Sequence, residues 1–147
     1  MTGSELIQIA AGLTGSLCFG VLFNMRGKRL IAAAVGGLLS WGLFVVLSHF
    51  ISNEPINYFI VAAVISLYSE IMARILKTPA APVVTTSLIP LIPGGSLYYT
   101  MASALENNFS MFLEKAVYTL KLACALALGI IAVTAISQFL FSRVKQK

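Results

Sequence analysis

Charged residues divide the chain into long apolar runs. Uncharged stretches of 20, 24, 28 and 21 residues follow Glu5, Arg29, Lys77 and Lys121, respectively. A helix needs about 20 apolar residues to cross the hydrocarbon core of a bilayer, so each of these four runs is long enough for one crossing. A fifth run of 15 residues ends at Glu70, and it reaches crossing length only if the helix continues past that acid.

The runs predict an all-α integral membrane protein with five transmembrane helices, folded as a single transmembrane domain over residues 1–147. The expected crossings lie at about residues 6–25, 30–50, 58–76, 83–105 and 120–141. Residues 107–121 mix apolar and polar side chains, and we expect them to form a short interfacial helix before the last crossing. Composition agrees, since 59% of the residues are hydrophobic and 10% are charged, whereas soluble domains carry roughly 25% charged residues.

Basic residues gather in alternate connections between the expected crossings. Five crossings place eight of the ten Lys and Arg residues on one side of the membrane: Arg26, Lys28, Arg29, Arg74, Lys77, Arg143, Lys145 and Lys147. Because positive loops stay in the cytoplasm, we expect the N-terminus outside and the C-terminus in the cytoplasm. Four crossings would split these clusters between the two sides. The net charge of +5 accordingly indicates orientation in a lipid bilayer and not a nucleic-acid surface.

Rows of small residues predict where the helices pack closely, because lipid gives no hydrophobic force between helices. The rows are Gly12, Ser16 and Gly20; Ala32, Gly36 and Ser40; and Ala125 with Gly129. Trp41 is expected to pack between helices, and Gln8 and Gln138 to form hydrogen bonds between them. Cys18 and Cys124 are expected to be buried as small apolar residues. The sequence contains no metal-ligand cluster or cofactor motif, so we expect neither a metal nor a cofactor.

The fourth crossing carries two prolines and two glycines near its middle, at Pro90, Pro93, Gly94 and Gly95. Each interior proline costs about 3 kcal/mol in a continuous helix and each glycine about 1 kcal/mol, so the four together approach roughly 8 kcal/mol. We therefore predict that the fourth helix is broken at Pro90–Gly95, with an unwound turn at Pro93–Gly95. Unwound backbone cannot face lipid with its polar groups unpaired, so it must line a polar cavity or contact a partner.

The predicted break is a candidate anion-binding site. Ser96 is placed to cap the second half-helix, and a helix N-terminus attracts anions through free N–H groups and a partial positive charge. Broken helices in transporters bind substrate carboxylates in this way. The predicted substrate-binding residues are Thr86, Pro90, Pro93, Gly94, Gly95, Ser96, Tyr98 and Tyr99, with further hydroxyls at Thr85, Ser87 and Thr100. They suit a small amino acid or a short carboxylate; the alternative is a proline kink that only shapes helix packing.

Glu70 is the second candidate, because a carboxylate inside a crossing costs roughly 2.5–3.5 kcal/mol on insertion scales and should face protein or water. It belongs to a polar stripe formed by Ser66, Ser69, Glu70, Ala73, Arg74 and Lys77. Arg74 follows one turn later, in the favourable order for an ion pair. Glu70 and Arg74 are therefore coupling candidates, with Glu70 carrying a proton or pairing with a substrate ammonium group. The alternative is a structural ion pair near the inner interface.

The run Ile89–Tyr99, in a short chain with five expected crossings, resembles the threonine/serine exporter family. More closely, it resembles the small separate subunit that corresponds to the C-terminal membrane half of the fused exporters. The resemblance implies export of threonine, serine or related small carboxylates, including dicarboxylates, driven by the proton gradient across a bacterial cytoplasmic (inner) membrane. It also implies a larger partner subunit with five spans of its own and a cytoplasmic domain.

Two other classes of function are weighed against a transport subunit. A structural membrane-anchor subunit, which never contacts substrate, is the main alternative. An intramembrane enzyme is disfavoured, since the chain has one histidine, no aspartate and no nucleophile–base pair at a recognisable spacing. Five crossings also leave no room for a soluble catalytic domain, so we expect no enzyme activity. Five spans are too few to enclose a path alone, and we therefore expect a hetero-complex, with a homo-oligomer as the alternative.

Overall fold

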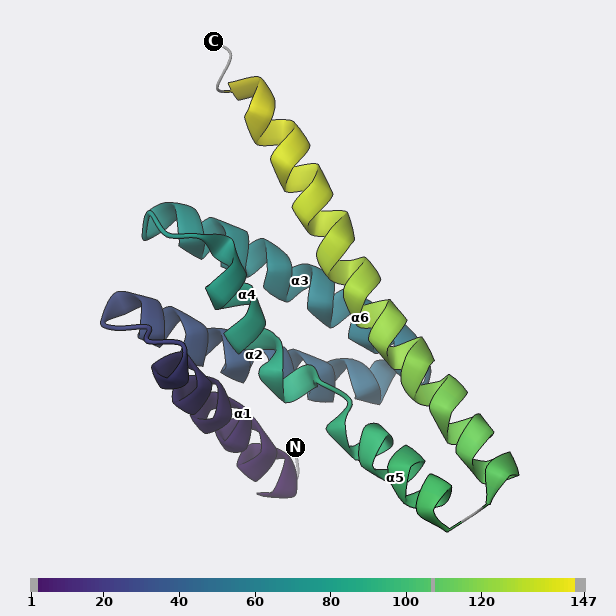
Figure 1. Ribbon diagram of the computed structural model, residues 1–147. Coiled ribbons are helices and arrows are strands. Elements are labelled where there is room, and N and C mark those ends of the chain that lie inside the picture. The colour runs from purple at the N-terminus through teal and green to yellow at the C-terminus, as the bar shows by residue number, and fades with distance from the viewer. Residues whose placement is uncertain (1–2, 107, 145–147) are drawn as a thin grey trace.

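Helices make up nearly all of the chain, whose computed structural model describes residues 3–106 and 108–144 (Figure 1). In order they are α1 (Gly3–Leu22), α2 (Lys28–Phe50), α3 (Glu54–Ile75), α4 (Ala80–Leu88), the 3₁₀ turn η1 (Ile89–Leu91), α5 (Gly94–Leu105) and α6 (Phe109–Val144). Within the described residues there is no β-strand, so the predicted all-α class is confirmed.

Short turns connect the first four helices, and each has a local cause. Between α1 and α2, Asn24 and Gly27 adopt left-handed backbone conformations, with φ of 56° and 59°, which these two residue types tolerate best. Pro55 stands in the first turn of α3, where its missing N–H is not needed. After α3, the N–H of Thr78 donates to the carbonyl of Ala73 at 2.8 Å and closes the helix end.

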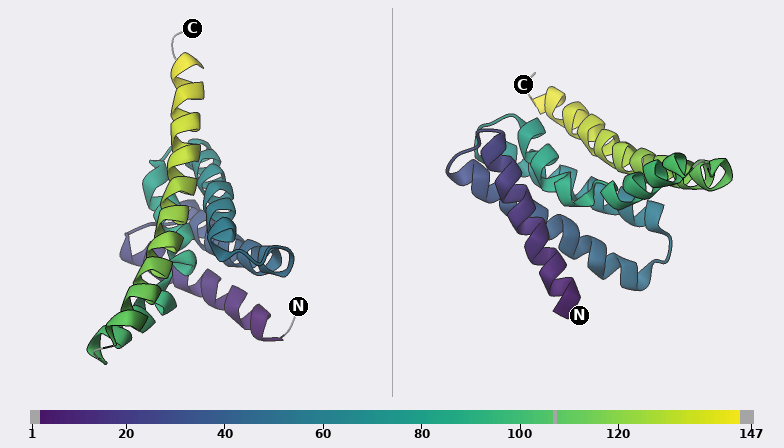
Figure 2. Two further views of the ribbon diagram at one scale, coloured as in Figure 1. Left: turned by 90° about the vertical axis from the view of Figure 1, so that its right-hand side faces the viewer. Right: turned by 60° about the horizontal axis from the view of Figure 1, so that its bottom comes forward.

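The first three helices run in alternating directions, and α4 with η1 packs across them (Figure 1). The most extensive contacts join α1 to α2 and α3 to α6. In contrast, α5 packs mainly against α6. Figure 2 shows the resulting α5–α6 hairpin extending away from α1 and α2. The hairpin is therefore joined to the bundle of α1 to α4 both at the predicted break and along the contact between α6 and α3.

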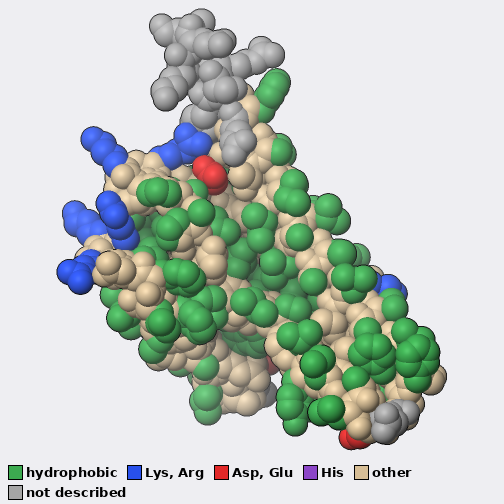
Figure 3. Space-filling view, viewed as in Figure 1, with side chains coloured by type: hydrophobic (Ala, Val, Ile, Leu, Met, Phe, Trp, Pro, Cys, Tyr) green, Lys and Arg blue, Asp and Glu red, His purple; other side chains and the backbone are tan. Residues whose placement is uncertain are grey.

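Among the described residues, four helices are long and apolar enough to cross a membrane, namely α1, α2, α3 and Phe109–Ser137 of α6. The segments on either side of the break, Ala80–Leu91 and Gly94–Leu105, pass the same test only together, as a pair bent by 60°. The fold thus contains four membrane-length helices, or five if the bent pair is one span. The basic turns after α1 and after α3 lie at one end of the bundle, where Figure 3 shows Lys and Arg side chains gathered. The side of the membrane that this end faces stays a prediction.

The predicted interfacial helix is wrong in its described part, because α6 is one continuous helix of 36 residues. Residues 109–128 contain neither proline nor glycine to interrupt it. At its start, Asn108 Oδ1 accepts the N–H of Met111 at 3.2 Å, as a capping side chain does. At 1.5 Å per residue α6 is about 54 Å long, well beyond a hydrocarbon core of about 30 Å. Its mixed N-terminal third is therefore a direct extension of the last crossing.

Small residues lie at the closest helix contacts, as predicted. The buried residues of α1 are Gly12, Ser16 and Gly20. A methyl group added to Gly37 of α2 would come within 2.8 Å of the Gly12 carbonyl oxygen. One added to Gly129 of α6 would come within 2.6 Å of the Phe59 carbonyl oxygen on α3. Neither position has room for a side chain, so these glycines set the distance between their helices.

The predictions for individual polar and sulfur-containing residues were confirmed in one case and wrong in another. The predicted interhelical hydrogen bond of Gln8 is confirmed, because Trp41 Nε1 donates to Gln8 Oε1 at 3.3 Å. The side chain of Gln138 lies outside the described residues. The prediction that Cys18 and Cys124 are buried is wrong, since both are exposed on this chain. They lie on faces of α1 and α6 that point away from the neighbouring helices.

We predict that Gly129→Leu destabilises the protein by about 1–3 kcal/mol, because the new side chain must push α6 away from α3. Thermal unfolding of detergent-purified protein, followed by circular dichroism, measures the effect. Gly42→Leu is the matched control, since a Cβ on Gly42 meets no heavy atom within 4 Å. Equal unfolding temperatures for the two variants would contradict the close α3–α6 contact.

Candidate functional site

The predicted break in the fourth segment is confirmed, and its unwound part lies slightly earlier than expected. The η1 turn leads into Ile92, whose backbone is extended with φ −60° and ψ 127°. Pro93 follows, and α5 begins at Gly94. The unwound link is therefore Ile92 and Pro93, whereas Gly94 and Gly95 are helical. Proline suits the position before the helix, because its φ of −74° lies within the range that its ring imposes.

Ser96 does not cap α5, contrary to the prediction. The N-cap position belongs to Pro93, which makes no side-chain cap hydrogen bond, and Ser96 stands inside the first turn. The N–H of Leu97 donates to the Pro93 carbonyl at 3.0 Å. The N–H groups of Gly95 and Ser96 precede this hydrogen bond, so they have no intrahelical acceptor and point toward the break. Free backbone donors are thus available at the break without a hydroxyl cap.

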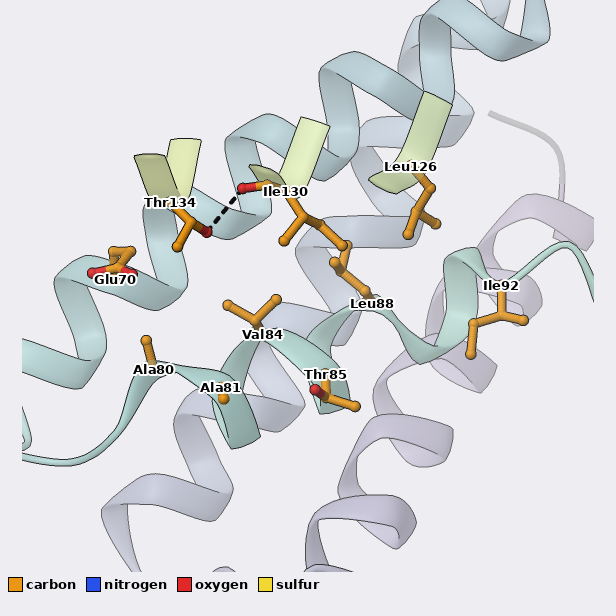
Figure 4. Close-up of a pocket in the computed structure, with 10 residues that line it drawn as sticks. All are labelled: Glu70, Ala80, Ala81, Val84, Thr85, Leu88, Ile92, Leu126, Ile130 and Thr134. Atoms are coloured by element: carbon orange, nitrogen blue, oxygen red, sulfur yellow. Dashed lines mark hydrogen bonds between the residues drawn. The ribbon is translucent and has the colours of Figure 1, made fainter. Parts of the chain in front are cut away.

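A cavity of about 510 Å³ lies between α3, α4 and α6 and ends at the break (Figure 4). It is lined by Glu70, Ala80, Ala81, Val84, Thr85, Leu88, Ile92, Leu126, Ile130 and Thr134. Figure 4 places Glu70 at one end of this set and Ile92 at the other. Two features that the sequence pointed to separately, the membrane acid and the broken helix, therefore border one cavity. We call it the Glu70 cavity.

The predicted ion pair between Glu70 and Arg74 is confirmed. The Arg74 guanidinium donates to Glu70 Oε2 at 3.3 Å and to the hydroxyl of Ser137 on α6 at 3.1 Å. The Glu70 side chain is 16% exposed, whereas that of Arg74 is 41% exposed. A neighbouring cavity of about 410 Å³ between α3 and α6 is lined by Glu70, Arg74 and Ser137 together with apolar side chains. Glu70 therefore stands between two cavities, and its partner arginine ties α3 to α6.

Thr85 lines the Glu70 cavity, whereas Thr86 lies on the other side of α4. Thr86 is fully buried, and its hydroxyl donates to the carbonyl of Pro82 at 2.7 Å. It also contacts the sulfur of Met25 at 3.9 Å, in the turn after α1. The Thr86 hydroxyl is thus already paired within its own helix.

The two tyrosines stand apart from the Glu70 cavity. Tyr98 and Tyr99 are 69% and 59% exposed on α5, with their ring centroids 5.5 Å apart. The ammonium group of Lys115 on α6 lies 5.5 Å from the centroid of the Tyr99 ring. Pro90 also points elsewhere, into a separate cavity on the side of α1 and α2. None of the eight predicted substrate-binding residues lines the Glu70 cavity, although Ile92, next to Pro93, does.

Sequence reasoning missed the wall that α6 contributes. Leu126, Ile130 and Thr134 line the Glu70 cavity at intervals of four residues, and the Thr134 hydroxyl donates to the Ile130 carbonyl at 2.8 Å. This spacing is visible in the sequence, but apolar rows of the same kind also mark faces that contact lipid. Among the described residues, no group of three or more His, Cys, Asp or Glu side chains could hold a metal ion.

Fold and cavity together define a class of protein. A chain of membrane-length helices, with one helix interrupted beside a cavity that reaches a carboxylate, has the architecture of a membrane transport protein. The chain also matches the family described as "Threonine/Serine exporter, ThrE" over residues 8–136 of its 147. It therefore belongs to the threonine/serine exporter family, a family of membrane transporters, and the resemblance carried by Ile89–Tyr99 is confirmed. No curated protein and no solved structure matches the chain.

We predict that Arg74→Ala lowers the free energy of unfolding by about 1–3 kcal/mol, because it leaves a largely buried carboxylate without its partner. In a Glu70→Gln background the same change should cost less, since no charge is left unpaired. Thermal unfolding of the four proteins of this cycle gives the coupling, and Arg29→Ala, at an exposed residue, is the control. An identical effect of Arg74→Ala in both backgrounds would mean that the Glu70–Arg74 pair contributes nothing to the free energy of unfolding.

Proposed function

We propose that this chain is a membrane subunit of a secondary exporter of small amino acids or carboxylates, threonine- or serine-like or dicarboxylate. In this proposal it works in a bacterial inner membrane, uses the proton gradient and acts with a larger five-span partner subunit. The observation that carries the proposal is the Glu70 cavity, which joins a membrane carboxylate to an interrupted helix in a member of an exporter family. Interrupted helices at membrane depth are where secondary transporters bind substrates and coupling ions.

In the proposed site the substrate carboxylate accepts hydrogen bonds from the first turn of α5. The free N–H groups of Gly95 and Ser96 supply donors, and the helix dipole adds a partial positive charge. A Cβ on Gly94 or Gly95 would meet no heavy atom within 4 Å, so open space surrounds these donors. A volume of about 510 Å³ lies in the range of small-molecule sites. Prolines 90 and 93 keep the backbone from closing into a continuous helix.

Glu70 is the proposed coupling residue, with Arg74 as its partner. A protonated Glu70 carries no charge and holds Arg74 less strongly, so proton binding loosens the contact that Arg74 makes with Ser137. The position of Glu70 between two cavities supports this role, because protons must be able to reach a residue that carries them. The alternative is a structural ion pair, for which the Ser137 contact is the supporting observation.

A partner subunit is proposed because the break lacks cover on one side. Within the described residues, α5 packs mainly against α6, and much of the hairpin surface is apolar (Figure 3). The exposed large side chains of the hairpin include Leu97, Tyr98, Tyr99, Met101, Leu105, Phe109, Met111 and Leu113. Polar backbone next to such a surface needs protein or water around it in a bilayer. A larger subunit of the same family would supply that cover.

We expect Glu70→Gln to remove most of the dependence of export on an imposed pH gradient, because the amide cannot carry a proton. Export from proteoliposomes containing both subunits, measured with and without the gradient, tests this. Glu106→Gln, at an exposed residue at the end of α5, is the control. Unchanged gradient dependence in Glu70→Gln would remove Glu70 from the coupling step.

Gly95→Leu should abolish export and leave assembly with the partner intact, because it fills the space before the free N–H groups without touching the helix contacts. Gly42→Leu, which adds the same side chain elsewhere in open space, should export normally. Co-purification of the partner checks assembly. Normal export by Gly95→Leu would favour a structural anchor subunit that never contacts substrate.

A further inference from the structure

The broken segment has a cavity on each of its two sides. The second cavity, of about 250 Å³, is lined by Gln8, Ala11, Gly12, Gly15, Trp41, Ile89 and Pro90. Leu88 and Ile92, on either side of Ile89 and Pro90, line the Glu70 cavity instead. Leu91 is fully buried between them. The turn over residues 88–92 is therefore a thin wall that separates two cavities. We call the second one the Gln8 cavity.

These two cavities extend toward opposite ends of the bundle. The Gln8 cavity includes the first half of α1, and α1 begins beside the end of α2, where His49 Nε2 lies 3.4 Å from Glu5 Oε1. The Glu70 cavity includes the last turns of α3 and the start of α4. Because α2 and α3 run in opposite directions, the end of α3 and the beginning of α1 are at opposite ends of the bundle (Figure 1). In a membrane, the two cavities would open toward opposite sides.

The polar side chains of the Gln8 cavity are those of Trp41, with one N–H donor, and Gln8, with two N–H donors and one acceptor oxygen. Trp41 Nε1 donates to Gln8 Oε1 at 3.3 Å, which is long for such a bond. The amide nitrogen of Gln8 carries two further N–H donors, and the Gln8 side chain is exposed on this chain. A carboxylate has only acceptors, so it fits this arrangement.

Two glycines shape the cavity. A Cβ on Gly12 would lie 3.1 Å from Trp41 Cβ and 3.6 Å from Pro90 Cβ, so Gly12 forms a tight floor beneath both side chains. A Cβ on Gly15 would meet no heavy atom within 4 Å. Gly15 therefore keeps the cavity open without taking part in helix packing, and its position can be changed without disturbing α1 and α2.

We propose that the Gln8 cavity is a second carboxylate-binding site on the transport path, across the turn of residues 88–92 from the Glu70 cavity. It is reached from the side of the membrane on which α1 begins. Substrate carboxylate oxygens accept N–H bonds from Gln8 and Trp41 and replace the bond between these two side chains. The inference rests on the proposed transport function and adds to it a named site and a direction of opening.

Cysteine labelling tests the two openings. Single cysteines are placed at Gly15, Thr85 and, as a control outside both cavities, Gly42, in a chain whose Cys18 and Cys124 are replaced by serine. Membranes that contain the chain with its native partners are prepared as vesicles of both orientations and treated with a membrane-impermeant thiol reagent. We expect Gly15→Cys to react from the side of an N-terminal tag, Thr85→Cys to react from the other side, and Gly42→Cys to react from neither.

Three labelling results would contradict the proposed second site. Reaction of Gly15→Cys and Thr85→Cys from the same side, or no reaction of Gly15→Cys from either side, would overturn the proposal. So would reaction of Gly42→Cys equal to that of Gly15→Cys, because the labelling would then report general exposure. None of these results depends on knowing the substrate, so they test the cavity separately from export.

Transport kinetics test the proposed donors. Trp41→Phe keeps the ring and removes the N–H, and Gln8→Leu removes the amide; each should raise the KM for L-threonine or malonate by about tenfold, as expected for losing one hydrogen bond to a charged group. Unchanged KM values in both variants would overturn the second site even if Gly95→Leu abolishes export. If Gly95→Leu exports normally, the proposed transport function itself fails, whatever the labelling shows.

Discussion

Backbone polar groups without helical partners cannot lie against hydrocarbon, and this constraint governs the arrangement of the chain. Pro90 and Pro93 carry no N–H, and the link at Ile92 and Pro93 leaves the N–H groups of Gly95 and Ser96 without helical partners. The neighbouring helices cover part of this segment. α1 and α2 cover η1 on one side, and α3 with α6 forms a cavity on the other side. A continuous fourth helix would need no such surroundings.

Small residues make this cover possible, so helix packing and the broken segment are parts of one arrangement. Gly12 lets α1 approach α2, since a Cβ there would lie 3.1 Å from the Trp41 Cβ and 3.2 Å from the Gly37 carbonyl oxygen. Gly36 of α2 faces the side chain of Ser87 on α4, where an added methyl group would overlap it. The rows of glycine and serine that bring the first two helices together also bring both against α4 and η1. A larger residue at Gly36 would therefore displace Ser87 and α4.

The sequence predicted the existence of the helices and the break better than it predicted their details. Long charge-free runs and adjacent prolines and glycines are strong local signals, so the all-α class, the membrane-length helices and the interruption followed from them. The unwound position was placed one to two residues late, because Pro93 can end an unwound link as well as begin one. The separate helix at 107–121 was wrong because mixed polarity does not interrupt a helix that lacks proline and glycine. Which of Thr85 and Thr86 faces the Glu70 cavity depends on how α4 packs, and no local sequence pattern specifies that packing.

The length of α6 has a structural consequence. Near its start, the hydroxyl of Thr119 lies 3.1 Å from that of Thr100 on α5, and near its other end Ser137 accepts a hydrogen bond from Arg74. Thr119 and Ser137 are 18 positions apart, which is about 27 Å at 1.5 Å per residue. One uninterrupted helix therefore connects the second half of the broken segment to the arginine that pairs with the membrane acid.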